Sequence, residues 1–152
     1  MTKKFFVSIL AVTLVSLSGL AYAQLGFGTD YTTSDAVFVV VNVKVDSNMM
    51  DFYLEGIKQT WVTGNEAAME LGQLDSYSIY INEFQDSGAY NLTLVTRFAD
   101  LAQYDKGRKE FAQFEELWLS KMPEQQRREI VADYPSMRTI TGEYLMREVT
   151  LQ

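Results

Sequence analysis

The side chains that most often carry enzyme chemistry are missing from this sequence. It contains no histidine and no cysteine among its 152 residues. A Ser-His-Asp triad, a Cys-His pair and a histidine-bound zinc or haem are therefore excluded, and so is a disulfide. Any proton transfer would have to use carboxylates or tyrosines with shifted pKa values. No catalytic motif is present, and we expect no cofactor and no bound metal.

The polar side chains that remain have simple structural explanations. Arg97, near the end of a predicted strand, could hold an acidic ligand, although an ion pair with Glu83 or Asp100 would explain it equally well. Glu115 and Glu116 are neighbours on a predicted helix and point in different directions, which indicates a solvated face. Several strand tyrosines could supply hydroxyl groups, yet tyrosine is common in strands because it packs well. These are Tyr77, Tyr80, Tyr90 and Tyr144.

The N-terminal segment has the pattern of a secretory signal peptide. Lys3 and Lys4 precede an apolar block over 5–20, and Ala-Tyr-Ala follows at 21–23 as an A-x-A cleavage site. The block is about 16 residues long, whereas a membrane span needs roughly 20. We therefore predict that residues 1–23 are removed and that the mature protein is periplasmic or secreted from a bacterial cell, with no membrane association.

Charge and length limit the partners of the mature chain. The formal net charge is −7, and it becomes −9 when the two lysines of the signal peptide are removed. Such a surface repels phosphate backbones, and no basic patch is present, so we expect no nucleic-acid partner. The remaining length fits one domain with its own hydrophobic core.

The segment 37–45, VFVVVNVKV, is predicted to be the central strand of the fold. Its β-branched side chains fit a pleated surface. Alternation places Val37, Val39, Val41, Val43 and Val45 on one face and Phe38, Val40, Asn42 and Lys44 on the other. A strand this apolar belongs inside a sheet that is covered on both faces. The polar stretch 24–36 before it is predicted to be a flexible leader.

The other elements follow from helical and strand periodicity. The predicted elements are a helix from caps at 46–48 to Gly72, strands over 75–84 and 90–98, a helix from Asp100 to Pro123, a short helix over 124–133 and a strand over 138–151. We expect a kink at Gly64 and a bulge at Gly142. The order predicts a single ferredoxin-like α+β domain over 37–152, β-α-β-β-α-β, with helices on one sheet face. The uncovered face predicts a homodimer.

Several segments resemble the dimeric α/β barrel superfamily. They are Trp61 on the first helix and the runs ELGQLDSYSIYINEF, YNLTLVTRFADL and MRTITGEYLMREVTL, and the resemblance covers residues 37–151. Members pair two ferredoxin-like sheets face to face, so the resemblance implies a homodimer. The superfamily includes cofactor-free monooxygenases and haem-degrading enzymes. The histidine that the haem-degrading relatives carry on the second helix is missing here.

In those relatives an asparagine on the first strand and a tryptophan can line a cavity between sheet and helices. The resemblance therefore implies Asn42 and Trp61 as ligand-binding candidates, and Tyr80 and Arg97 complete the set. The alternative is that Asn42 bonds a neighbouring side chain or interfacial water and Trp61 is core. Two functions stay open. One is an exported soluble dimeric module that binds a small apolar or aromatic ligand, and the other is a cofactor-free monooxygenase or isomerase acting on an aromatic or quinone-like molecule.

Overall fold

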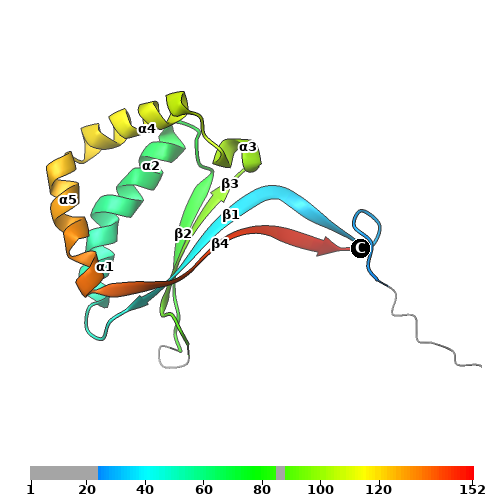
Figure 1. The fold of residues 1–152 in the computed structure, drawn as a ribbon, viewed down its shortest axis with the longest axis horizontal. Helices are drawn as coiled ribbons and strands as arrows, with labels where there is room; N and C mark the ends of the chain where they lie inside the picture. The colour runs from blue at the N-terminus through cyan, green and yellow to red at the C-terminus, as the bar shows by residue number, and fades with distance from the viewer. Residues whose placement is uncertain (1–23, 85–87) are drawn as a thin grey trace, which may run out of the picture.

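A four-stranded antiparallel sheet with helices on one face forms the body of the molecule (Figure 1). The computed structural model describes residues 24–84 and 88–152, so the predicted signal peptide lies outside the described residues. The strands are β1 (Tyr31–Val45), β2 (Ser76–Ile81), β3 (Leu92–Phe98) and β4 (Arg138–Leu151), in the order β2-β3-β1-β4. With helices between β1 and β2 and between β3 and β4, this is the ferredoxin-like arrangement. The predicted fold is confirmed.

The valine strand lies inside the sheet, as predicted. β1 pairs with β3 and with β4, with Val41 opposite Leu94 on one side and Glu143 on the other. The odd-numbered valines face the helices, and Val37, Val43 and Val45 are almost completely buried. They join Tyr53, Ile57, Leu92, Leu94 and Tyr134 in the core. The even-numbered side chains of β1 lie on the opposite face. None of the described helices covers that face (Figure 1).

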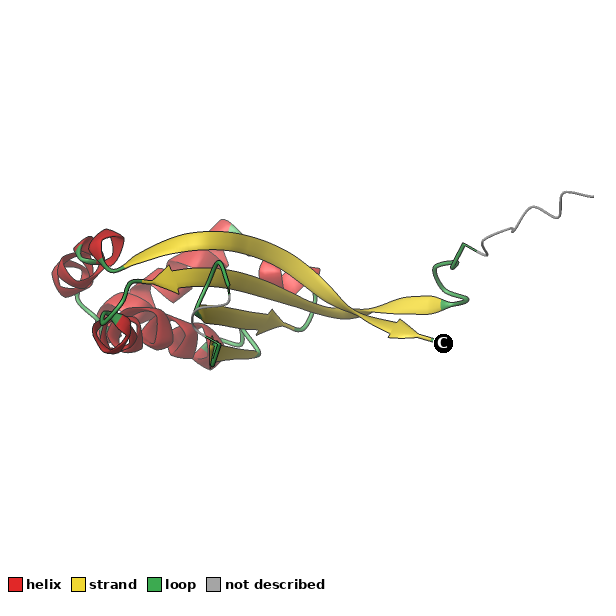
Figure 2. Cartoon of the chain, turned by 90° about the horizontal axis from the view of Figure 1, so that it is seen from below, coloured by secondary structure: helices red, strands yellow, loops and turns green. Residues whose placement is uncertain are grey.

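The N-terminal part of β1 differs from the sequence prediction. The strand begins at Tyr31, so residues 31–36, predicted as part of the flexible leader, are in a strand. Residues 31–33 pair with the end of β4, with Tyr31 opposite Leu151, and Tyr31 also forms a single parallel bridge with Phe27. Figures 1 and 2 show these paired ends running beyond the rest of the sheet, away from the helices. Local composition did not reveal this strand because its partner is more than a hundred residues away in the sequence.

The first helix is continuous but changes its winding at the centre. It consists of α1 (Met50–Ile57), a π-helical turn η1 (Lys58–Val62) and α2 (Thr63–Glu70). The predicted caps at 46–48 are wrong: they form a turn in which Asn48 has φ +65°, and no side chain caps Met50. The irregularity expected at Gly64 lies just before it, in η1. Such π turns often occur at functional sites, and Trp61 lies in this one.

The second helical layer is divided into three helices. They are α3 (Leu101–Tyr104), α4 (Arg108–Lys121) and α5 (Glu124–Ala132), followed by a 3-10 turn, η2 (Tyr134–Ser136). Asp100 caps α3 as predicted, since its Oδ1 accepts a 2.7 Å hydrogen bond from the Gln103 N–H. The prediction of one helix from Asp100 to Pro123 is wrong because the chain unwinds at 105–107. No helix in the described ranges is long and apolar enough to cross a membrane.

Candidate functional site

A cavity of about 440 Å³ lies between the helix-facing side of the sheet and the helices α2 and α4. Six of its fourteen lining residues are aromatic: Trp61, Phe98, Tyr104, Phe111, Phe114 and Trp118. Its polar side chains include Asn65 from α2, Thr96 from β3, Lys106 from the α3–α4 connection and Glu143 from β4. The cavity therefore combines a large aromatic surface with a few polar groups, the usual composition of a small-molecule site.

The aromatic wall follows from the spacing of residues on α4. Phe111, Phe114 and Trp118 recur at steps of three and four, which places them on one helix face. Their neighbouring ring centroids are 6.3 Å and 5.2 Å apart. On α2, Gly64 allows the close approach of Trp118, because a Cβ at that position would lie 3.2 Å from the indole ring. Glycine at this position therefore fixes how closely α2 and α4 approach.

Three polar groups at the cavity have definite environments. The Lys106 ammonium lies 5.0 Å from the centroid of the Phe98 ring, and burial lowers the pKa of Lys106. Asn65 donates through Nδ2 to the carbonyl of Trp61 at 2.8 Å, and its side-chain oxygen takes no part in that bond. The Trp118 Nε1–H is buried without a hydrogen-bond partner among the described residues. Buried polar groups are normally paired, so this donor is energetically costly.

The four candidates from the sequence do not meet in this cavity. Trp61 lines it, but Asn42, Tyr80 and Arg97 lie on the opposite, helix-free face of the sheet. There the Oδ1 of Asn42 accepts a 2.9 Å hydrogen bond from Thr93, which agrees with the alternative that Asn42 bonds a neighbouring side chain. Tyr80 is 58% exposed. The described structure therefore gives these four residues no common binding point.

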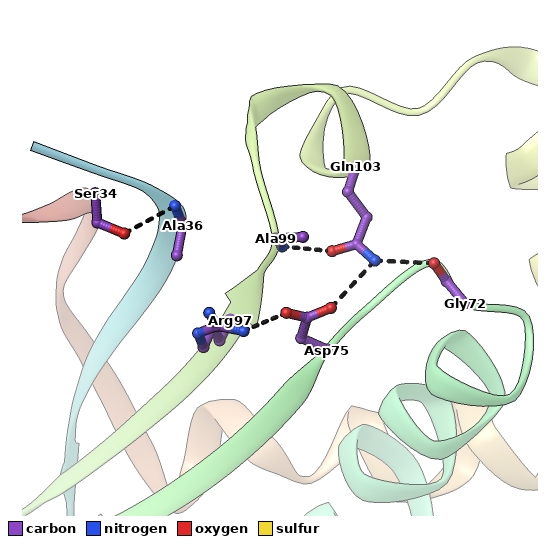
Figure 3. Close-up of polar contacts among 7 residues, drawn as sticks. All are labelled: Ser34, Ala36, Gly72, Asp75, Arg97, Ala99 and Gln103. Atoms are coloured by element: carbon purple, nitrogen blue, oxygen red, sulfur yellow. Dashed lines mark hydrogen bonds and ion pairs between the residues drawn. The ribbon is translucent and has the colours of Figure 1, made fainter.

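Arg97 instead joins the start of β2 to α3 (Figure 3). Its guanidinium forms an ion pair with Asp75, and neither Glu83 nor Asp100, the partners considered from the sequence, holds it. Asp75 also accepts from the side chain of Gln103 at 3.4 Å. Gln103 in turn donates to the carbonyl of Gly72 at 2.9 Å and accepts from the N–H of Ala99 at 2.6 Å. Arg97 thus belongs to a structural network.

Sequence reasoning missed Lys106 and Asn65. The sequence predicted one helix from Asp100 to Pro123. Unwinding at 105–107 instead turns Lys106 toward Phe98. Asn65 stands beside Gly64, whose contact with Trp118 is a tertiary feature. Among the described residues, no group of three or more acidic side chains is arranged to hold a metal ion.

Comparisons with known proteins support no finer assignment than the fold. No protein-family model matches the chain, and no curated protein matches it. HapK from Hahella chejuensis is 12% identical with a TM-score of 0.43, over 74% of this chain and 91% of HapK. A dimeric ferredoxin-like protein of unknown function from Thermobifida fusca is 11% identical with a TM-score of 0.37, over 84% of this chain and 97% of that protein. The fold of this chain is ferredoxin-like, as its sheet order shows.

Proposed function

We propose that this protein is a dimeric binding module for a small, flat aromatic or other apolar molecule. The observation that carries the proposal is the aromatic cavity between the sheet and the helices α2 and α4. Its volume, about 440 Å³, falls within the range of roughly 300–1,000 Å³ that is usual for small-molecule sites. Aromatic side chains on both the sheet and the helices favour a planar ligand, which can stack on one ring and meet others edge-on.

Lys106 indicates how such a ligand would be oriented. Its ammonium group has lost part of its hydration, which is why its pKa is lowered. A ligand oxygen placed beside it would replace the lost hydrogen bonds with a charge-assisted one. The favoured ligand is therefore an aromatic or quinone-like molecule that carries a carbonyl or phenolate oxygen at one edge.

The competing function, a cofactor-free monooxygenase or isomerase, is less well supported. Such an enzyme would need polar groups, with Asn42, Trp61, Tyr80 and Arg97 as the candidates, to meet around one reacting molecule. Three of these lie on the helix-free face, and Arg97 is engaged by Asp75. Binding, in contrast, needs only the cavity and its polar edge.

Menadione, a quinone of suitable size, tests the proposed site. Both tryptophans of the chain, Trp61 and Trp118, line the cavity, so a bound quinone should quench the intrinsic fluorescence in a saturable way. The Thr96→Phe variant places a ring in the cavity from the sheet side, and we expect at least a tenfold loss of affinity, about 1.4 kcal/mol.

Thr150→Phe is the matched control, because it makes the same change near the far end of β4. It should quench like the wild type. Equal quenching of wild type and Thr96→Phe by menadione would show that the quinone binds elsewhere. Circular dichroism melts of both variants establish that they are folded.

The open sheet face supports the dimeric part of the proposal. Apolar side chains of three strands lie on it, and no helix covers them: Phe38, Val40, Val95, Tyr144 and Met146. Tyr144 and Met146 are half exposed. A second copy of the chain, placed sheet against sheet as in the superfamily that the sequence resembles, would bury this surface.

We further propose that the protein is exported and acts outside the cytoplasm. The proposal rests on the lysines, the apolar block and the Ala-Tyr-Ala site within residues 1–23. Intact-mass measurement of the protein isolated from its native host should give a chain that starts at Gln24. A mass that includes residues 1–23 would contradict export by this signal.

A further inference from the structure

A second pocket, of about 400 Å³, lies on the other side of the two tryptophans and is surrounded by arginine side chains. Arg127 and Arg128 reach it from α5, and Arg138 reaches it from the first residue of β4. The chain as a whole is acidic, with a net charge of −7. Three guanidinium groups at one pocket of such a protein form a local cationic site, which the quinone-binding proposal does not use.

Two of these arginines form no ion pair with the described residues. Arg128 forms an ion pair with Glu124, one turn earlier on α5. Arg127 and Arg138, in contrast, have no carboxylate within ion-pair distance among the described residues. The Nε of Arg138 is buried and has no hydrogen-bond partner there. Guanidinium groups that lie at a partly apolar pocket without a carboxylate partner favour an anion that enters it.

Two of the arginines lie over aromatic rings. The guanidinium carbon of Arg127 lies 4.5 Å from the ring centroid of Trp118. That of Arg138 lies 5.5 Å from the centroid of Tyr134 and 5.8 Å from that of Tyr53. The Tyr134 hydroxyl is fixed by a 2.5 Å hydrogen bond with Thr60. These cation–π contacts restrict the rotamers of both arginines, which lowers the entropy lost when they bind an anion.

The shape and chemistry of the pocket select the anion. Planar guanidinium groups match the two oxygens of a carboxylate. The remaining walls are apolar or aromatic, including Trp61, Trp118 and Val131. A small hydrated ion would leave these walls without contacts, whereas a flat hydrophobic body would cover them. We propose that this pocket binds a small aromatic carboxylic acid, with Arg138 and Arg127 holding the carboxylate and the tryptophans contacting the ring.

Calorimetric titration of the full chain with 1-naphthoate tests the proposal. Its neutral counterpart, 1-naphthylmethanol, has the same ring system without the charge. We expect naphthoate to bind at least tenfold more tightly than the alcohol, and its affinity to fall as sodium chloride is raised. Arg138→Gln and Arg127→Gln should each weaken naphthoate binding about tenfold or more, as expected for the loss of a charge-assisted hydrogen bond.

Arg108→Gln is the matched control, because it removes the same charge at the other end of α4. It lies ten residues from Trp118, about 15 Å along the helix. It should leave naphthoate affinity unchanged, and melting curves establish that each variant is folded. The proposal is overturned if the alcohol binds as tightly as naphthoate, or if Arg138→Gln and Arg127→Gln both bind naphthoate like the wild type.

A competition titration separates this site from the quinone cavity. Naphthoate should still bind in the presence of saturating menadione, because its carboxylate is held by arginines that do not line that cavity. If naphthoate displaces menadione and binds the arginine variants as tightly as the wild type, naphthoate occupies the first cavity. That result would overturn the arginine-site proposal and leave the proposed function intact. Failure of menadione to bind, with arginine-dependent binding of naphthoate, would overturn the proposed function alone.

Discussion

The Val40→Lys variant is expected to be a monomer at micromolar concentrations at which the wild type is a dimer. Val40 is at the middle of the open face, opposite Val95 on β3 and Tyr144 on β4. In a two-fold interface each substitution occurs twice, so two unpaired ammonium groups would be buried together. The cost of several kcal/mol per buried ion corresponds to a loss of affinity of at least about 100-fold. Light scattering over a range of protein concentrations measures the dissociation constant of the dimer.

Ala112→Lys controls for the added charge. Residue 112 is exposed on α4, in the helical layer on the other face of the sheet, so the dimer should persist. Since the side chain of Val40 does not contribute to the buried core around Val43, the monomer should stay folded. A wild type that is monomeric at these concentrations, or a Val40→Lys variant with an unchanged dissociation constant, would contradict dimerisation through this face.

The sequence predicted well those elements whose structure depends on residues within the same short segment. The alternation of 37–45 predicted the strand and the two sets of side chains on its faces, and the five valines form the set that faces the helices. The closing strand was predicted at its observed bounds, Arg138–Leu151. The bulge expected at Gly142 is present, because the register of β4 shifts between Gly142 and Ile140. Asp100 could be recognised as a cap because its side chain accepts a hydrogen bond from the first turn of the helix that follows it in the sequence.

The features that depend on distant partners could not be predicted in this way. Residues 31–36 are polar and lack a strand pattern, and pairing with β4 makes them a strand. The break at 105–107 is what turns Lys106 toward the cavity. Arg127 and Arg138 are brought together by the turn between α5 and β4, and nothing in their spacing indicates a common pocket. The resemblance implied Asn42 as a ligand-binding residue, but the alternation of β1 places it on the face away from the helices.

A substitution at Asn91 is expected to cause the largest loss of stability. Its buried side chain takes the place of a strand partner for Val45. The Oδ1 accepts from the Val45 N–H at 2.7 Å, and the Nδ2 donates to the Val45 carbonyl at 2.8 Å. Asn91→Ala would leave both backbone groups unpaired beside the core, at about 1–3 kcal/mol each. We therefore expect the free energy of unfolding to fall by roughly 2–6 kcal/mol in a urea titration.

Asn91→Asp and Asn82→Ala show whether hydrogen bonding is the cause. Aspartate has nearly the same size, but it cannot donate to the Val45 carbonyl and buries a charge, so it should destabilise at least as much as alanine. The bonds that the described residues give the side chain of Asn82 lie within the exposed hairpin loop, so Asn82→Ala should cost less than about 1 kcal/mol. If Asn91→Ala unfolds within about 0.5 kcal/mol of the wild type, the two bonds to Val45 contribute little to stability. The edge of the core would then depend on apolar packing around Val45 alone.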